Sequence, residues 1–141
     1  PPKAGPADPA SADIFAKECD ALRPLMTRLA AEYPNLQTIA ATLRRVHTAG
    51  VNDWGALAWH KGEFFRSRDY PRFDILDRIG AGDSFVAGLI HGLLSSGDPQ
   101  LAVDLGAAHG ALAMTTPGDT SMATQAEVLA LIAGGDAKVQ R

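Results

Sequence analysis

A glycine-rich segment at residues 77–85 carries the side chains of this sequence that are best suited to chemistry. It reads DRIGAGDSF and leads from a short apolar stretch directly into a helical pattern. Gly80 and Gly82 lack Cβ atoms, so the backbone can turn tightly and approach a ligand closely. The first N–H groups of a helix are unpaired and lie at the positive end of its dipole, which suits a phosphate group. The segment therefore predicts an anion site.

Asp83 lies at the start of the same predicted helix. The helix dipole stabilises a carboxylate there, so we expect it to stay ionised. Beside a bound phosphoryl group it can accept a proton from an attacking hydroxyl, and phosphoryl transfer otherwise needs mainly positioning and charge stabilisation. Taken alone, the four residues Gly-Ala-Gly-Asp are more typical of a tight turn with a capping carboxylate.

The elements before this segment are predicted to be one helical region and several strands. Residues 1–10 contain four prolines and predict a flexible leader, with the remaining residues 11–141 forming one domain. Residues 11–33 have helical spacing, but Pro24 predicts a kink or two helices. Residues 36–43 predict a short buried strand. Residues 50–60 and 63–70 predict a hairpin that turns at Lys61-Gly62.

The elements after the segment are predicted to be helices. The first covers residues 84–95 and the second begins at Asp98 and Pro99 and reaches about Met114. A loop follows at residues 117–119. Thr124 and Glu127 have the spacing of a capping box for a last helix that ends at residues 134–135. The order of helix, strands and helices favours half of an α/β domain.

The composition is that of an ordinary globular protein and excludes several classes of function. Apolar residues make up 46% and charged residues 21%, and the net charge is −3. The absence of a basic stripe argues against a nucleic-acid partner, and no apolar run approaches the roughly 20 residues that span a bilayer. The single cysteine, Cys19, excludes an internal disulfide, is expected to pack in the core, and fits a cytoplasmic location.

The whole segment resembles the second signature of the ribokinase-like (PfkB) carbohydrate kinases, Asp-Thr-x-Gly-Ala-Gly-Asp-x-Phe. Arg78 stands where that signature has Thr. Further short matches resemble the 2-keto-3-deoxygluconate kinases of the family. They are Thr-Leu-Arg at 42–44, Asn-Asp-Trp-Gly at 52–55, Pro-Gly-Asp at 117–119 and Val-Gln-Arg at 139–141.

The resemblance implies an α/β fold, namely the C-terminal part of a ribokinase-like doubly wound sheet with flanking helices. The family's first signature, its lid, its N-terminal sheet strands and its Asn-x-x-Glu element for magnesium are expected upstream of the matched region. We therefore expect these 141 residues alone to catalyse poorly and to expose an unpaired sheet edge.

The resemblance also implies site residues. Asp83 would be the general base, and the Gly80, Ala81 and Gly82 amides the anion hole. Asp77 would steady the loop or simply cap the turn. In the nucleotide-side pattern Thr-x-Gly-x-x-Gly, Thr42 takes the Thr position and Arg44 replaces the first Gly, either binding phosphate or lying on the surface.

The loop before the last helix is implied to contribute to the adenine pocket and to a potassium-type site, through Thr115 and Gly118. His109 is expected to be packing or surface. The implied cofactors are ATP and Mg²⁺, with a monovalent cation such as K⁺ as a further candidate.

The predicted function is ATP-dependent phosphorylation of 2-keto-3-deoxygluconate to its 6-phosphate. Two alternatives stay open: a kinase for another sugar such as fructose, ribose or a nucleoside, and a non-catalytic fragment that binds nucleotide or a partner chain. The partners would be ATP and a small sugar or sugar acid, without nucleic acid or membrane. The sequence is compatible with a homo-oligomer but does not specify one.

Overall fold

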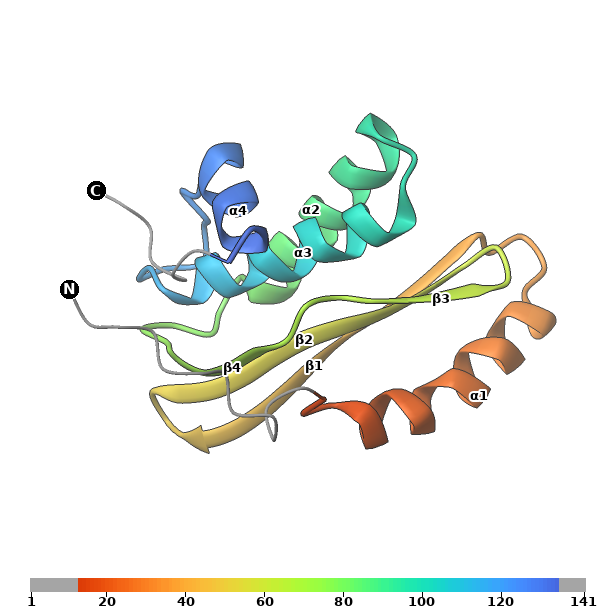
Figure 1. The fold of residues 1–141 in the computed structure, drawn as a ribbon, viewed down its shortest axis with the longest axis horizontal. Helices are drawn as coiled ribbons and strands as arrows, with labels where there is room; N and C mark the ends of the chain where they lie inside the picture. Colours follow the sequence, from red (N-terminus) through yellow and green to blue (C-terminus); the bar gives the residue numbers. More distant parts are fainter. Residues whose placement is uncertain (1–12, 135–141) are drawn as a thin grey trace.

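The computed structural model describes residues 13–134, which form a four-stranded sheet with helices on both faces. Helix α1 (Ala16–Glu32) lies along one face, and α2 (Ala81–Ser95), α3 (Pro99–Met114) and α4 (Gln125–Ile132) lie on the other (Figure 1). The predicted α/β class is confirmed. The predicted leader at residues 1–10 and the Val-Gln-Arg tail lie outside the described residues.

Every strand pair in the described part is antiparallel. Strand β1 (Thr38–Thr48) pairs with β2 (Val51–His60), and the other edge of β2 pairs with β3 (Glu63–Arg66) and β4 (Tyr70–Asp74). The turn between β2 and β3 uses Lys61 at φ 48° and Gly62 at φ 101°. Two consecutive left-handed residues match the twist of a tight hairpin, which confirms the predicted turn.

The first strand differs from its prediction. It begins at Thr38 and extends to Thr48. Leu43 is its only buried residue, so the strand as a whole is not buried. Within residues 13–134, β1 pairs with β2 only and is an edge strand. The apolar composition of residues 36–43 predicted burial. Burial also depends on neighbouring elements, and no described strand lies beside the outer edge of β1.

Helix α1 is one continuous helix through Pro24, so the alternative of two helices is wrong. Pro24 cannot donate to the carbonyl of Asp20, but both residues are exposed, so water can satisfy that carbonyl. The buried side of α1 carries Cys19 and Met26, which pack against Leu43 of β1. Cys19 is buried in this cluster, which confirms its predicted packing role, and the burial raises the pKa of its thiol.

The larger core lies between β2, α2 and α3. Trp54 of β2 is buried there and donates its indole N–H to the carbonyl of Ala107 on α3 at 2.9 Å. Helices α2 and α3 approach closely because glycines face each other. A Cβ on Gly88 would lie 2.7 Å from the Leu105 carbonyl oxygen and 2.9 Å from Cα of Gly106.

The helix ends confirm the local signals in the sequence. Asp98 accepts hydrogen bonds from the first turn of α3, with Pro99 as its first residue. Thr124 and Glu127 form the predicted capping box of α4. Helix α2 begins at Ala81, three residues earlier than predicted, with Gly80 as its N-cap. None of the helices in residues 13–134 is long and apolar enough to cross a membrane.

Gly88→Ala tests the α2–α3 contact. We expect a loss of about 1–3 kcal/mol of unfolding free energy, because an added methyl group meets backbone atoms that cannot move aside. Urea unfolding followed by circular dichroism measures it. Gly82→Ala in the same helix is the control, because its Cβ would meet nothing within 4 Å, and it should be neutral or stabilising by up to about 1 kcal/mol. Equal stability of the two variants would contradict the packing argument.

Candidate functional site

The first turn of α2 presents unpaired backbone N–H groups to open space. Gly80 is its N-cap, with φ 81°, and no side chain caps the turn. A Cβ on Gly80 would lie 2.2 Å from the Asp119 carbonyl oxygen, so only glycine fits where the 117–119 loop touches this turn. Ala81 is buried, whereas Gly82 is exposed and faces nothing within 4 Å. The turn is therefore not filled by side chains.

Asp83 is the third residue of α2 and is exposed. In the same turn of the helix, Ala81 and Ser84 are buried and hold the turn against the core. Its carboxylate is thus carried on a rigid element and is accessible from outside. This is the placement that a base for an incoming hydroxyl requires.

Asp77 holds the glycine-rich loop together from within. Its carboxylate accepts from the Ile79 N–H at 3.1 Å. That bond is the main reason why the Asp77 pKa lies below its usual range. Desolvation opposes it, and the Gly118 and Arg78 N–H groups lower the pKa by smaller amounts. Asp77 therefore joins the loop before α2 to the loop after α3. The same carboxylate of Asp77 both caps the turn, through the Ile79 N–H, and steadies the loop, through the Gly118 N–H.

A cleft of about 380 Å³ opens between the sheet and the first turn of α2. We call it the cationic cleft; it is lined by Thr42, Arg44, Trp54, Arg78, Ile79, Ala81, Gly82 and Met114. The structure thus brings the predicted residues Thr42 and Arg44 to the Ala81–Gly82 turn, although they are 37 to 40 positions apart in the sequence. Arg78 also lines the cleft, although the sequence marked it only as a departure from the family signature.

Strand alternation decides which arginine of β1 reaches this cleft. Arg44 lies opposite Trp54 in the ladder, on the side of the sheet that faces α2 and α3. Arg45 points to the other side, where it forms an ion pair with Glu18 at 2.7 Å.

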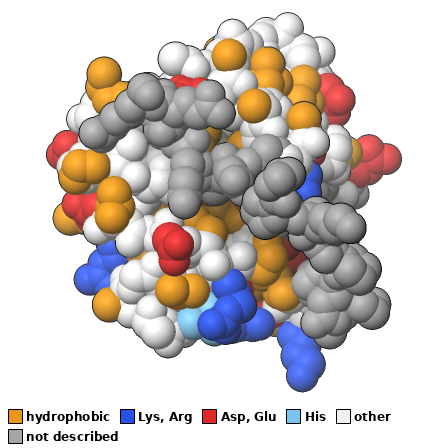
Figure 2. All heavy atoms as spheres, turned by 60° about the vertical axis from the view of Figure 1, so that its left-hand side comes forward, with side chains coloured by type: hydrophobic (Ala, Val, Ile, Leu, Met, Phe, Trp, Pro, Cys, Tyr) orange, Lys and Arg blue, Asp and Glu red, His pale blue; other side chains and the backbone are white. Residues whose placement is uncertain are grey.

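Basic side chains are also visible on the side of the molecule toward which the β1–β2 turn points. On that face, Lys and Arg side chains gather beside a histidine along the lower edge of the view (Figure 2). Hydrophobic side chains are exposed at several places on the same face.

Thr115 and Gly118 do not line the cationic cleft. Thr115 directs its hydroxyl back to the Leu112 carbonyl at 2.8 Å, which ends α3. Gly118 adopts φ 96° in the following loop and reaches the site through its contact with Asp77. Among residues 13–134 there is no group of three His, Cys, Asp or Glu side chains placed to hold a metal ion.

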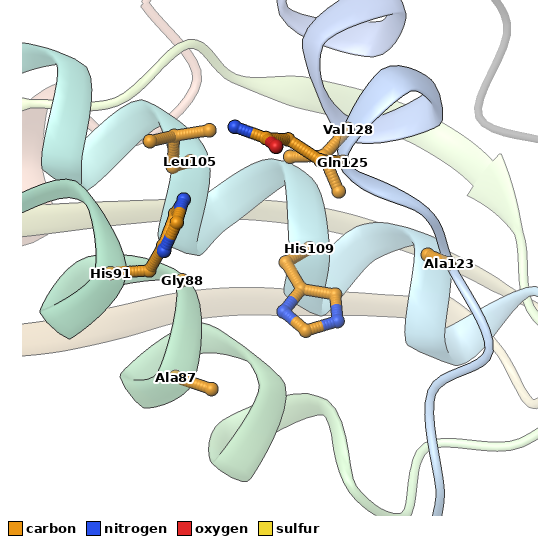
Figure 3. Close-up of a pocket in the computed structure, with 8 residues that line it drawn as sticks. All are labelled: Ala87, Gly88, His91, Leu105, His109, Ala123, Gln125 and Val128. Carbon is orange, nitrogen blue, oxygen red and sulfur yellow. The ribbon is translucent and has the colours of Figure 1, made fainter. Parts of the chain in front are cut away.

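A second cleft of about 290 Å³ lies between α2, α3 and the start of α4 (Figure 3). We call it the apolar cleft; it is lined by Ala87, Gly88, His91, Leu105, His109, Ala123, Gln125 and Val128. Figure 3 shows His91 and Gln125 facing its interior from α2 and α4. Sequence reasoning missed both, because the lining comes from three helices and has no local pattern.

His109 both packs and lines the apolar cleft. It is half-buried, its Nε2 lies 3.0 Å from the Ser121 hydroxyl, and its ring bonds to the Ser84 backbone. Burial lowers the His109 pKa below its usual value of 6.5, and the Ser84 bond opposes this only in part. The neutral ring therefore links α3 to the turn that carries Asp83.

Three comparisons relate this arrangement to known proteins. The sequence pattern described as "pfkB family carbohydrate kinase" matches residues 30–126. A 2-dehydro-3-deoxygalactonokinase of Haloferax volcanii is 37% identical over 87 residues, which are 62% of this chain and 27% of that protein. The chain thus spans about a quarter of the length of this curated relative.

Two solved structures share the fold. A 2-dehydro-3-deoxygluconokinase of Thermotoga maritima superposes with a TM-score of 0.77 at 34% identity, over 82% of this chain and 35% of that one. A PfkB family carbohydrate kinase of Listeria grayi gives a TM-score of 0.75 at 27% identity, over 90% and 40% of the two chains.

His109→Gln tests the neutral histidine. The pKa of His109 is lower in the folded state than in the unfolded state, so the unfolded chain binds a proton first as pH falls. The free energy of unfolding should therefore decrease as pH drops below about 6.5. The variant keeps hydrogen-bonding capacity but cannot titrate, so it should lose less stability between pH 7 and 5 than the parent. Urea unfolding at both pH values measures this. His91→Gln is the control, and equal losses for parent and His109→Gln would refute the assignment.

Proposed function

Because the chain belongs to the pfkB family of carbohydrate kinases, we propose that the whole protein uses ATP to phosphorylate a hydroxyl of a sugar acid. The proposed substrate is 2-keto-3-deoxygluconate, and the product is its 6-phosphate. Asp83 is the proposed general base, and the amides of Gly80, Ala81 and Gly82 form the proposed anion hole. The observation that carries the proposal is the exposed Asp83 on a helix turn whose amide face is open.

The two clefts flank the first turns of α2 in a way that suits a nucleotide. Gly88 in the apolar cleft follows Gly82 in the cationic cleft by six residues, about 9 Å along a helix. The apolar cleft would hold the base between Leu105 and Val128, since such a pocket with few polar groups is typical of ligand sites. The phosphates would then reach the N-terminus of α2.

The proposed transfer uses this chain's residues mainly for positioning and charge. The acceptor hydroxyl would lie beside Asp83, which takes its proton as the oxygen attacks the terminal phosphorus in line. The bond between that phosphorus and its bridging oxygen would break, and ADP would leave. The Ala81 and Gly82 N–H groups, at the positive end of the α2 dipole, would stabilise the charge that develops on the phosphoryl oxygens.

A magnesium ion would enter with the nucleotide, because residues 13–134 contain no group of three His, Cys, Asp or Glu side chains placed to hold one. Mg²⁺ in kinases is held by one or two carboxylates together with substrate phosphates and water, and Asp77 and Asp83 both lie in this segment. When bound, it would neutralise phosphate charge. Thr115 and Gly118 remain proposed contributors to the nucleotide and potassium side, through the loop that Asp77 fixes.

The proposed substrate rests on the relatives. The Haloferax and Thermotoga proteins are named as kinases of 2-dehydro-3-deoxy sugar acids. The cationic cleft agrees with an anionic acceptor as well as with phosphate. Activity of the whole protein on a panel of sugar acids, fructose, ribose and nucleosides separates this proposal from a kinase for another sugar.

Asp83→Asn in the whole protein tests the base. We expect kcat to fall by a factor of about 10²–10⁴, the usual contribution of general base catalysis, with little change in stability because the side chain is exposed. A coupled assay of ADP release measures kcat. Asp20→Asn, an exposed aspartate on α1, is the control. Near-normal turnover of Asp83→Asn would exclude the proposed mechanism.

The second candidate, a non-catalytic nucleotide-binding fragment, is favoured by the exposed surface of the 141-residue chain. Val86, Ile90 and Leu94 form an exposed stripe at four-residue spacing on α2, and β1 lacks an outer neighbour among the described strands. Surfaces of this kind are normally covered by other parts of a protein.

Calorimetry with ATP on the 141-residue chain separates the candidates. We expect binding that Ala87→Trp abolishes, because the new ring fills the apolar cleft that Ala87 lines. Val86→Trp, one residue away and outside the cleft lining, is the control. Binding without phosphate transfer to a sugar acid supports the fragment candidate, and turnover excludes it. Unchanged ATP affinity in Ala87→Trp would contradict the assignment of the base to this cleft.

A further inference from the structure

The two positions where this sequence departs from the family's phosphate-side patterns meet in space. Arg78 replaces the Thr of the glycine-rich signature, and Arg44 replaces the first Gly of the earlier loop. The two are 34 residues apart in sequence, yet both line the cationic cleft together with Ala81 and Gly82. Both departures introduce the same side chain, a guanidinium, at the same anion site.

Neither guanidinium is neutralised by the described protein. The ion pairs within residues 13–134 involve Arg45, His47 and Arg66, and none involves Arg44 or Arg78. The charge of Arg78 lowers the Asp77 pKa, but it is the smallest of the effects on that pKa. Arg45, adjacent to Arg44 but on the opposite face of the sheet, shows the contrast, since it is paired with Glu18. The cleft therefore holds two uncompensated positive charges.

The surroundings leave these charges available to a ligand. Trp54 and Met114 contribute to the lining of the cleft but offer no charged acceptor to a guanidinium, since the indole is only a donor and the thioether only a weak acceptor. Both arginines start from fixed backbone, Arg44 in the β1–β2 ladder and Arg78 in the turn held by Asp77. An arginine fork binds two phosphate oxygens at once, which suits this arrangement.

We propose that Arg44 and Arg78 act together as a clamp on the terminal phosphates of the nucleotide, an inference that rests on the proposed kinase function. Two guanidinium groups and the N-terminus of α2 offer more charge than one carboxylate can neutralise, which favours a phosphate over the acid group of the acceptor. In the clamp, Arg78 stands in place of the family's Thr hydroxyl, and Arg44 stands in place of the Gly that would let the backbone approach the phosphate. Binding through it depends on ionic strength.

The test measures binding of inorganic tripolyphosphate to the 141-residue chain by calorimetry at two salt concentrations. Arg44→Gln and Arg78→Gln should each weaken binding about tenfold, as expected for loss of a charge-assisted hydrogen bond. The double variant should bind weaker still and show a shallower salt dependence. Arg28→Gln, an exposed arginine on α1, is the control and should bind as the parent does. Circular dichroism confirms that each variant is folded.

The clamp would be overturned if the parent chain did not bind tripolyphosphate. It would also be overturned if Arg44→Gln and Arg78→Gln both bound tripolyphosphate with an affinity within twofold of that of Arg28→Gln. A third contradicting result would be that the two variants lose binding of gluconate but keep binding of tripolyphosphate. The last result would assign the arginines to an acceptor carboxylate. Failure of the clamp is distinguishable from failure of the kinase proposal, because the latter is read from turnover of Asp83→Asn and not from phosphate binding. An active kinase whose arginine variants bind tripolyphosphate normally would refute the clamp alone.

Discussion

The contact between α2 and α3 is the constraint on which the site depends. The two helices meet through Gly88, Gly92 and Gly106, where any Cβ would collide with the partner helix. This close approach fixes the axis of α2 against an almost wholly buried α3. Because α2 is held along its length, its first turn projects a fixed set of N–H groups and the Asp83 carboxylate. A rigid helix is a more exact support for a site than a loop.

Two loops complete that support at the N-terminus of α2. The 117–119 loop touches Gly80 so closely that no side chain fits there, and Asp77 ties the preceding loop to Gly118. The segment between β4 and this turn is tied as well, since the N–H groups of Leu76 and Asp77 donate to the Met114 carbonyl at 2.8 and 3.3 Å. The segment is thus fixed by backbone contacts, which leaves the side chains of Arg78 and Asp83 exposed to the outside.

Features with a local cause could be predicted from the sequence. The Lys61-Gly62 turn, the Asp98-Pro99 helix start and the Thr124–Glu127 capping box each depend on a few adjacent residues, and each was correct. Burial of β1 was wrong because it depends on which strand lies beside it. The apolar cleft was missed for the same reason, since its lining is assembled from three helices. The roles of Asp83 and the glycine-rich turn remain predictions that their exposed placement supports.

The position of Arg44 shows how a non-local fact changes the interpretation of a residue. In the sequence, Arg44 and Arg45 are adjacent arginines at the end of an apolar stretch. In the sheet, the two-residue period sends Arg45 to Glu18 and sends Arg44 to the open turn of α2. An arginine with an acidic partner already has its charge balanced, whereas one beside unpaired helix N–H groups adds to their positive potential. Such an accumulation of like charge costs free energy in the unliganded protein, because nothing in the described residues offsets it. An anionic ligand that binds there removes this cost. The register of one strand pair therefore places an exposed residue at the proposed anion site.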